Sequence, residues 1–124
     1  MLNLVVVEGT LARPAQDVEL PSGSRLISLE VTVRRDEGPA EPVPVAWFDA
    51  PAWATSLDAG VGVLVIGRVR RRFFRSGGVT QSRTEVVASR VVRARASARV
   101  RAALDEAAAA IAAAGQAASR SKVG

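Results

Sequence analysis

The stretch 25–35 alternates apolar and polar side chains more regularly than any other part of this 124-residue chain. Successive side chains of a strand point to opposite faces of its sheet. A period of two therefore indicates a strand with one face in a core and the other in solvent. The apolar set falls on odd positions and is expected to be buried: Ile27, Leu29, Val31 and Val33.

Four further segments have the residue types of strands, and turn-forming stretches separate them. These segments are residues 3–8, 43–47, 61–74 and 81–93. The first is followed by Gly9, which suits a strand that closes a barrel where a side chain would obstruct a neighbour. The last two are joined by Ser76, Gly77 and Gly78, a turn signal between two long strands.

Residues 50–59 contain one or two helical turns, with Trp53 and Leu57 on one side and Gly60 as the expected C-cap. Five strands with a short helix between the third and the fourth are the layout of an OB-fold, an all-β Greek-key barrel. An SH3-like barrel of five strands is the rival architecture. We assign residues 1–93 to this barrel domain.

The remaining residues, 94–124, have a different composition, with fourteen alanines in thirty-one positions. Val100, Leu104 and Ile111 form a narrow apolar stripe, which predicts a helix over 98–114 that Gly115 ends. Such a tail can bury little apolar surface, so we expect that it can be removed without unfolding the barrel.

Charge is distributed unevenly along the chain. Residues 1–60 carry four arginines and nine acids, residues 61–93 eight arginines and one acid, and residues 94–124 five basic and two acidic groups. The net charges of these segments, −5, +7 and +3, sum to the formal +5 of the whole chain. A basic surface confined to the last two strands is typical of a polyanion site, although arginines that only solvate a sheet face would give the same count.

Catalysis is not indicated, because the chain lacks both histidine and cysteine. Asp49 and Asp58 lie on opposite sides of the short helix, with no serine or second carboxylate at a useful spacing. We therefore expect no enzyme, no metal and no cofactor. No apolar run approaches the ~20 residues that span a bilayer, and no secretory signal is present, so we expect a cytoplasmic protein without a membrane partner.

The stretch 68–75 combines arginines with aromatic rings. Guanidinium groups neutralise backbone phosphates and an exposed ring stacks on a base, so a strand face that carries both suits a single-stranded nucleic acid. Phe74 is expected on this face unless a hairpin or an oligomer contact covers it, and Phe73, of the other parity, is expected in the core. The residues of one face are Arg68, Arg70, Arg72 and Phe74, opposite Val63, Val65 and Val69.

Several segments resemble, in the same order, the bacterial single-stranded-DNA-binding protein (SSB) family. The opening strand and turn are similar over residues 3–5 and 9–14, and the second strand follows Pro21-Ser22-Gly23. The match is tighter over residues 63–70 (VLVIGRVR), Phe74 and residues 83–88 (RTEVVA). The resemblance covers about residues 1–93 and implies an OB-fold, usually tetrameric, that wraps single-stranded DNA without sequence preference.

Position by position, Phe74 matches a base-stacking tryptophan of that family, and Arg70 and Arg72 match basic positions beside it. The chain lacks the family's acidic C-terminal tip, so recruitment of repair proteins through such a tip is not expected. Where the family places stacking aromatics, this chain has Arg34-Arg35 and Pro42-Val43, and Trp47 or Phe48 could be core. The candidate nucleic-acid-binding residues are Arg34, Arg35, Arg68, Arg70, Arg72, Phe74 and Arg75.

Three interpretations stay open at this point. The first is sequence-independent binding of single-stranded DNA, auxiliary to replication, recombination or repair. The second is a protein-interaction module that kept the barrel and lost most stacking aromatics, and the third is an RNA-binding OB domain. Uncovered strand edges also predict a homo-oligomer, either a dimer or a tetramer.

Overall fold

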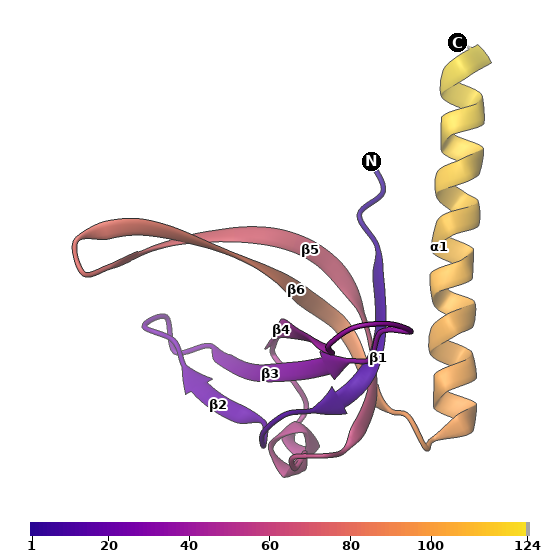
Figure 1. Cartoon of the computed structure of the whole chain (residues 1–124). Coiled ribbons are helices and arrows are strands. Elements are labelled where there is room, and N and C mark those ends of the chain that lie inside the picture. Colours follow the sequence, from indigo (N-terminus) through magenta and orange to yellow (C-terminus); the bar gives the residue numbers. More distant parts are fainter. Residues whose placement is uncertain (124) are drawn as a thin grey trace.

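The computed structural model describes residues 1–123, which form a closed β-barrel and one long helix (Figure 1). The strands lie in the order β1-β5-β6-β4-β3-β2, and an additional β1–β3 pairing closes five of them into a barrel. Every pairing is antiparallel except that of β4 with β6. The strands are β1 (Val5–Leu11), β2 (Gln16–Glu19), β3 (Arg25–Val33), β4 (Glu41–Phe48), β5 (Gly62–Ser76) and β6 (Val79–Arg93).

This architecture confirms the predicted all-β OB-fold, including the short helix between the third and fourth barrel strands. That helix is the 3-10 helix η1 (Ala52–Ser56). It ends before Gly60, which lies in the turn ahead of β5 with a φ of 83°, so the expected C-cap at Gly60 is wrong. Leu57, which is fully buried, takes the C-cap position instead.

Gly9 lies where the barrel closes, as its place in the sequence predicted. Its neighbour Thr10 pairs with Thr32 of β3 and with Gly62 of β5. A β-carbon at Gly9 would collide with the carbonyl oxygen of Thr32. A side chain at this position would therefore prevent β1 from reaching both neighbours at once.

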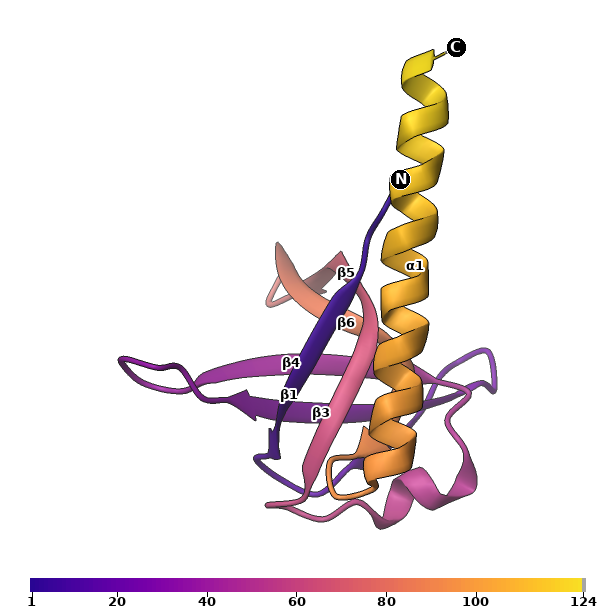
Figure 2. The ribbon, with the colours of Figure 1, turned by 90° about the vertical axis from the view of Figure 1, so that its right-hand side faces the viewer.

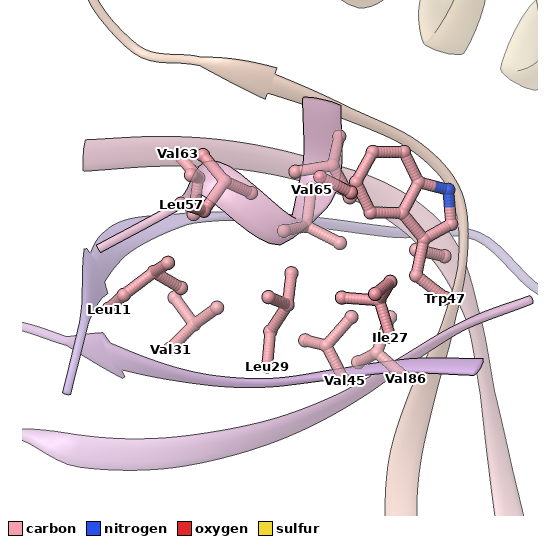
Figure 3. Packing of buried hydrophobic residues seen from close by; sticks show 13 residues of the cluster. Leu11, Ile27, Leu29, Val31, Val45, Trp47, Leu57, Val63, Val65 and Val86 are labelled. Atoms are coloured by element: carbon pink, nitrogen blue, oxygen red, sulfur yellow. The ribbon is translucent and has the colours of Figure 1, made fainter. Parts of the chain in front are cut away.

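The alternating residues of β3 form the centre of the core (Figure 3). Ile27, Leu29 and Val31 are buried, and Val33 is half-buried against them. Trp47 of β4 packs edge-on against Trp53 of η1, with ring centroids 5.5 Å apart. Other members of this core are Leu11, Val45, Leu57, Val63, Val65, Val86, Ala88 and Val91.

A bulge divides the two longest strands into a base and an exposed hairpin. The register shifts between Ile66 and Gly67, and Ser89 stabilises the irregularity by donating from Oγ to the Ile66 carbonyl oxygen at 3.1 Å. A β-carbon at Gly67 would collide with the carbonyl oxygen of Val87. We call the hairpin beyond the bulge, residues 68–76 of β5 with residues 79–87 of β6, the arm. It curves away from the barrel over β2 and β3 (Figure 1).

The helix α1 (Ser97–Val123) packs on the outside of β5 and β6 with its N-terminal part, and its C-terminal part extends beyond the barrel (Figure 2). Its contacts come from Val100, Ala103 and Ala107, which cover a second apolar cluster. Arg90 of β6 adds an ion pair to Glu106 at 2.6 Å. The strand side chains of this cluster are Leu64, Ile66 and Val92.

The predicted end of the helix at Gly115 is wrong, and the apolar stripe is only partly buried. Val100 packs against the strands, but Leu104 and Ile111 are about half exposed while the smaller Ala103 and Ala107 are buried. Alanines let the helix axis approach the strands closely. The helix also continues through Gly115, where the cost of about 1 kcal/mol relative to alanine is spread over an alanine-rich segment.

Within the described residues, β2 is the one strand that the sequence did not predict. Its four residues are exposed and pair with the start of β3, from Gln16 opposite Ser28 to Glu19 opposite Arg25. Arg25 and Asp17 form an exposed ion pair at 2.7 Å, and hydrogen bonding to Asp17 is the main cause that raises the pKa of Arg25. This edge strand adds length to the β3 face without contributing to the core.

Candidate nucleic-acid interface

A groove lies between the arm and the outer face of β2, β3 and β4, and it encloses about 390 Å³. Its floor is mainly apolar, and one wall carries the arginines of the arm. We refer to it as the groove. The residues that line it are Val18, Leu20, Leu26, Ser28, Pro44, Val45, Ala46, Phe48, Arg70, Arg72, Arg83 and Glu85.

Strand register explains why these side chains meet. Arg70 lies opposite Glu85 and Arg72 opposite Arg83, so all four share one face of the arm. The parallel pairing of Val45 with Val86 continues this face onto β4. On β4, the side chains that point away from the core line the groove.

Glu85 is the charged residue around which the groove is built. Its side chain is only 6% exposed, and its two oxygens accept from different arginines. Arg72 Nε donates to Oε1 at 2.9 Å and Arg70 Nη2 to Oε2 at 3.2 Å. A carboxylate this buried is stable only with such partners, and it fixes the direction of both guanidinium groups. With Arg83 the cluster holds three positive charges and one negative, a net of +2.

Each of these two arginines also lies beside an aromatic ring. The Arg70 guanidinium carbon is 5.2 Å from the centre of the Phe48 ring, and that of Arg72 is 5.4 Å from the Phe74 ring. Both rings are half-buried. The Nε of Arg70 is buried without an acceptor, so its hydrogen-bonding capacity is not exhausted by Glu85.

The structure brings only part of the predicted site to the groove. Arg70 and Arg72 line it, and Phe74 lies next along the same face. Arg68 borders a neighbouring hollow with Asn3, and Arg75 donates to the Gly78 carbonyl oxygen at 3.0 Å near the tip of the arm.

Arg34 and Arg35 follow the end of β3, away from the groove. Arg34 is six residues beyond Ser28, about 20 Å along an extended chain, and Arg35 pairs with Glu41 at 3.5 Å. Both arginines are exposed. The structure therefore does not bring them together with Arg70 and Arg72.

The expectation that Phe73 belongs to the core is wrong. Its side chain is 67% exposed, and Val69 on the same face is 43% exposed. The parity assignment is correct, but on β5 the buried stretch ends at Gly67. Val86 of β6, opposite Val69, still belongs to the core, and beyond this pair the face has no layer over it.

Among the charged and aromatic residues of the groove, the sequence analysis missed three: Phe48, Arg83 and Glu85. Phe48 could have been found from parity, since Trp47 and Phe48 must face opposite ways on one strand. Arg83 and Glu85 required the register of β6 against β5. The turn at Gly77 and Gly78 sets that register: it places Ser76 opposite Val79 and, counting back along the hairpin, Arg70 opposite Glu85. The sequence located the turn but did not show which two residues it leaves unpaired.

Asn3 holds the base of the arm. Its side-chain Nδ2 donates to the Val69 carbonyl oxygen at 2.8 Å, and its Oδ1 accepts from the Val69 amide at 2.9 Å. The backbone pairing of β1 with β5 starts at Val5 opposite Gly67, so the Asn3 amide extends the ladder by one pair. This contact fixes the angle at which the arm leaves the barrel.

No protein-family model matches the sequence, and no curated protein does. Among solved structures, the wild-type single-stranded DNA binding protein from Thermus aquaticus superposes with a TM-score of 0.61, and a deletion mutant of it with 0.62. Both are 28% identical to this chain. The fold is an SSB-like OB-fold.

The SSB-like region covers 74% of this chain but only 40% of the Thermus aquaticus chains. Similarity to DNA-binding proteins agrees with the expectation of a binding protein and not an enzyme. Within residues 1–123, no helix combines the length and the apolar character needed to cross a membrane.

Proposed function

We propose that this protein binds single-stranded DNA, without sequence preference, in the groove between the arm and the β3–β4 face. The observation that carries the proposal is the combination of paired arginines and rings: Arg70 beside Phe48, and Arg72 beside Phe74. Guanidinium groups supply phosphate contacts, and rings supply stacking surfaces that accept any base.

The groove is suited to sequence-independent binding. Ser28 is the one uncharged hydrogen-bonding side chain among its lining residues. Reading a base edge requires several such groups at fixed positions, whereas stacking and phosphate neutralisation do not. Leu26 and Pro44 provide apolar floor against which sugars and base faces can pack.

Glu85 acts on this site through the arginines. By holding Arg70 and Arg72 in place it reduces the conformational entropy that the two side chains lose when DNA binds. It also cancels one positive charge. Binding is therefore expected to be less salt-dependent than three arginines alone would make it.

Similarity to the single-stranded DNA binding protein from Thermus aquaticus supports the same function. A role auxiliary to replication, recombination or repair, and assembly into a dimer or tetramer, remain predictions. The free edges of the arm support assembly, since β1 pairs with β5 only as far as Gly67.

The experiment is a titration of the purified protein with fluorescently labelled oligo-dT, oligo-U and duplex DNA at several salt concentrations. The proposal predicts tight, salt-dependent binding to oligo-dT and much weaker binding to the duplex. Equal or tighter binding to oligo-U would favour an RNA-binding domain. Absence of binding to all three would favour the protein-interaction module.

A further inference from the structure

The arm has a second face, opposite the groove, that also combines cations with a ring. Val69, Arg71, Phe73 and Arg75 alternate along β5 and share this face, which we call the Phe73 face. Phe73 is 67% exposed, and it is the most exposed of the chain's aromatic side chains for which burial is described. A ring this exposed on a charged hairpin has most of its surface available for a ligand.

The Phe73 face contains no acid on the arm. The residues of β6 opposite Arg71, Phe73 and Arg75 are Thr84, Ser82 and Thr80, which carry only hydroxyl groups. Within the described residues, neither arginine forms an ion pair, and Arg75 bonds only to the Gly78 carbonyl oxygen. This differs from the groove face, where Glu85 compensates part of the charge.

The geometry suits a single strand. Arg71 and Arg75 each lie two residues from Phe73, about 7 Å to either side along the strand. A base stacked on the ring would have its flanking phosphates within reach of both guanidinium groups. The threonine and serine hydroxyls beside them add neutral donors.

We propose that the Phe73 face is a second binding surface for single-stranded nucleic acid, so that a strand filling the groove continues around the arm and stacks on Phe73. This inference rests on the proposed function of the groove. The alternative occupant is a second copy of the chain, but that copy would bring the same two uncompensated arginines to the contact. Like charges at an interface oppose association, whereas a polyanion neutralises them.

The test compares a short and a long oligonucleotide. An OB-fold covers about 4–16 nucleotides, so an oligo-dT of about 6 fits the groove and one of about 30 also reaches the other face. Phe73→Ala should leave the affinity for the short oligonucleotide unchanged. It should weaken binding of the long one by about 5- to 150-fold, the contribution of one stacked base.

The double substitution Arg71→Gln with Arg75→Gln should flatten the salt slope for the long oligonucleotide by about 1.4, which is about 0.7 for each of two phosphate contacts. The matched control is Val79→Ala, which removes an exposed apolar side chain of the same arm without a ring. It should change neither affinity. Thermal unfolding of each variant checks that the barrel is intact.

Two results would overturn the inference while the groove still binds. One is a Phe73→Ala protein that both binds the two oligonucleotides and self-associates as the parent does. The other is a Phe73→Ala protein with unchanged DNA affinity that light scattering shows to have lost its self-association, which would make this face an interface between copies. Absence of binding by the parent to either oligonucleotide would contradict the proposed function itself.

Discussion

The two halves of β5 have the same antiparallel pairing with β6 and different surroundings. In the base of the hairpin, every residue from Val63 to Gly67 is buried, because the barrel core covers one face and α1 the other. In the arm, no residue from Arg68 to Ser76 is fully buried. A strand with two covered faces must be apolar throughout, whereas one that extends past its core can carry charge on both faces.

Three local features of the backbone and side chains define the boundary between the halves. Gly67 lets β6 approach, the Ser89 hydroxyl stabilises the bulge, and Asn3 pairs with the backbone of Val69. Because of the bulge, Ala88 and Val91, of opposite parity, both face the core. These contacts fix the base of the arm to the barrel, which favours a site made of aligned arginines.

Truncation of the helix is expected to have the largest effect on stability. A chain that ends at residue 93 exposes the face of Leu64, Ile66 and Val92, and we expect a loss of roughly 3 kcal/mol or more in the free energy of unfolding. A chain that ends at residue 110 keeps Ala103 and Ala107 in place and should unfold like the parent. Denaturant unfolding of the two truncations measures the difference.

The sequence alone predicted that all of residues 94–124 could be removed. With Val100, Ala103 and Ala107 packed on the strands, we now expect this only of the residues that follow the docked part of α1. Residue 124 lies outside the described residues. Equal stability of the two truncations would show that α1 does not protect the base of the hairpin.

A pair of matched substitutions tests the two halves directly. Val65 and Val69 lie on the same strand and face, but Val65 is fully buried and Val69 is 43% exposed. Val65→Ala should cost about 2–3 kcal/mol through lost packing and a cavity, and Val69→Ala less than about 0.5 kcal/mol. Urea titration of both variants checks this. Similar losses would mean that β5 is packed as tightly in the arm as in the base.

Removing the negative charge of Glu85 from the groove is expected to have a smaller effect, on DNA affinity and its salt dependence. Glu85→Gln should strengthen oligo-dT binding by about two- to fivefold at low salt, the scale of one partly exposed charge pair, and steepen the salt slope by up to about 0.7. Glu41→Gln, which removes the same charge from the exposed pair with Arg35, is the control and should change both quantities less. Weaker binding by Glu85→Gln with an unchanged melting temperature would show that orienting the arginines matters more than the lost charge.

Much of the fold could be predicted because its signals are local. The alternation around Leu29 identified the central strand, and Gly9 marked the closure of the barrel. The short exposed β2 has no apolar face and therefore gave no pattern. In the tail, burial favoured Ala103 over the larger Leu104, since close approach to the strands and not side-chain size decides which helix face docks.

The candidate site was predicted only in part, because its geometry depends on pairing between distant strands. The arginine-rich strand was visible, and parity placed Arg70 and Arg72 on one face. The pairing of β5 with β6 places Glu85 opposite Arg70, and the pairing of β4 with β6 brings Phe48 to the same face. Phe73 was assigned to the core because parity alone does not show where a core ends.

The central claim is that arginines and rings on the groove face of the arm contact a single strand in different ways. Salt-dependent titration of oligo-dT with Phe74→Ala and Arg72→Ala tests it most directly. Phe74→Ala should weaken binding by about 1–3 kcal/mol with the salt slope unchanged, because stacking releases no counterions. Arg72→Ala should flatten the slope by about 0.7, the value for one phosphate contact. If both variants bound oligo-dT with the affinity and salt slope of the parent, the groove would not be the DNA-binding site.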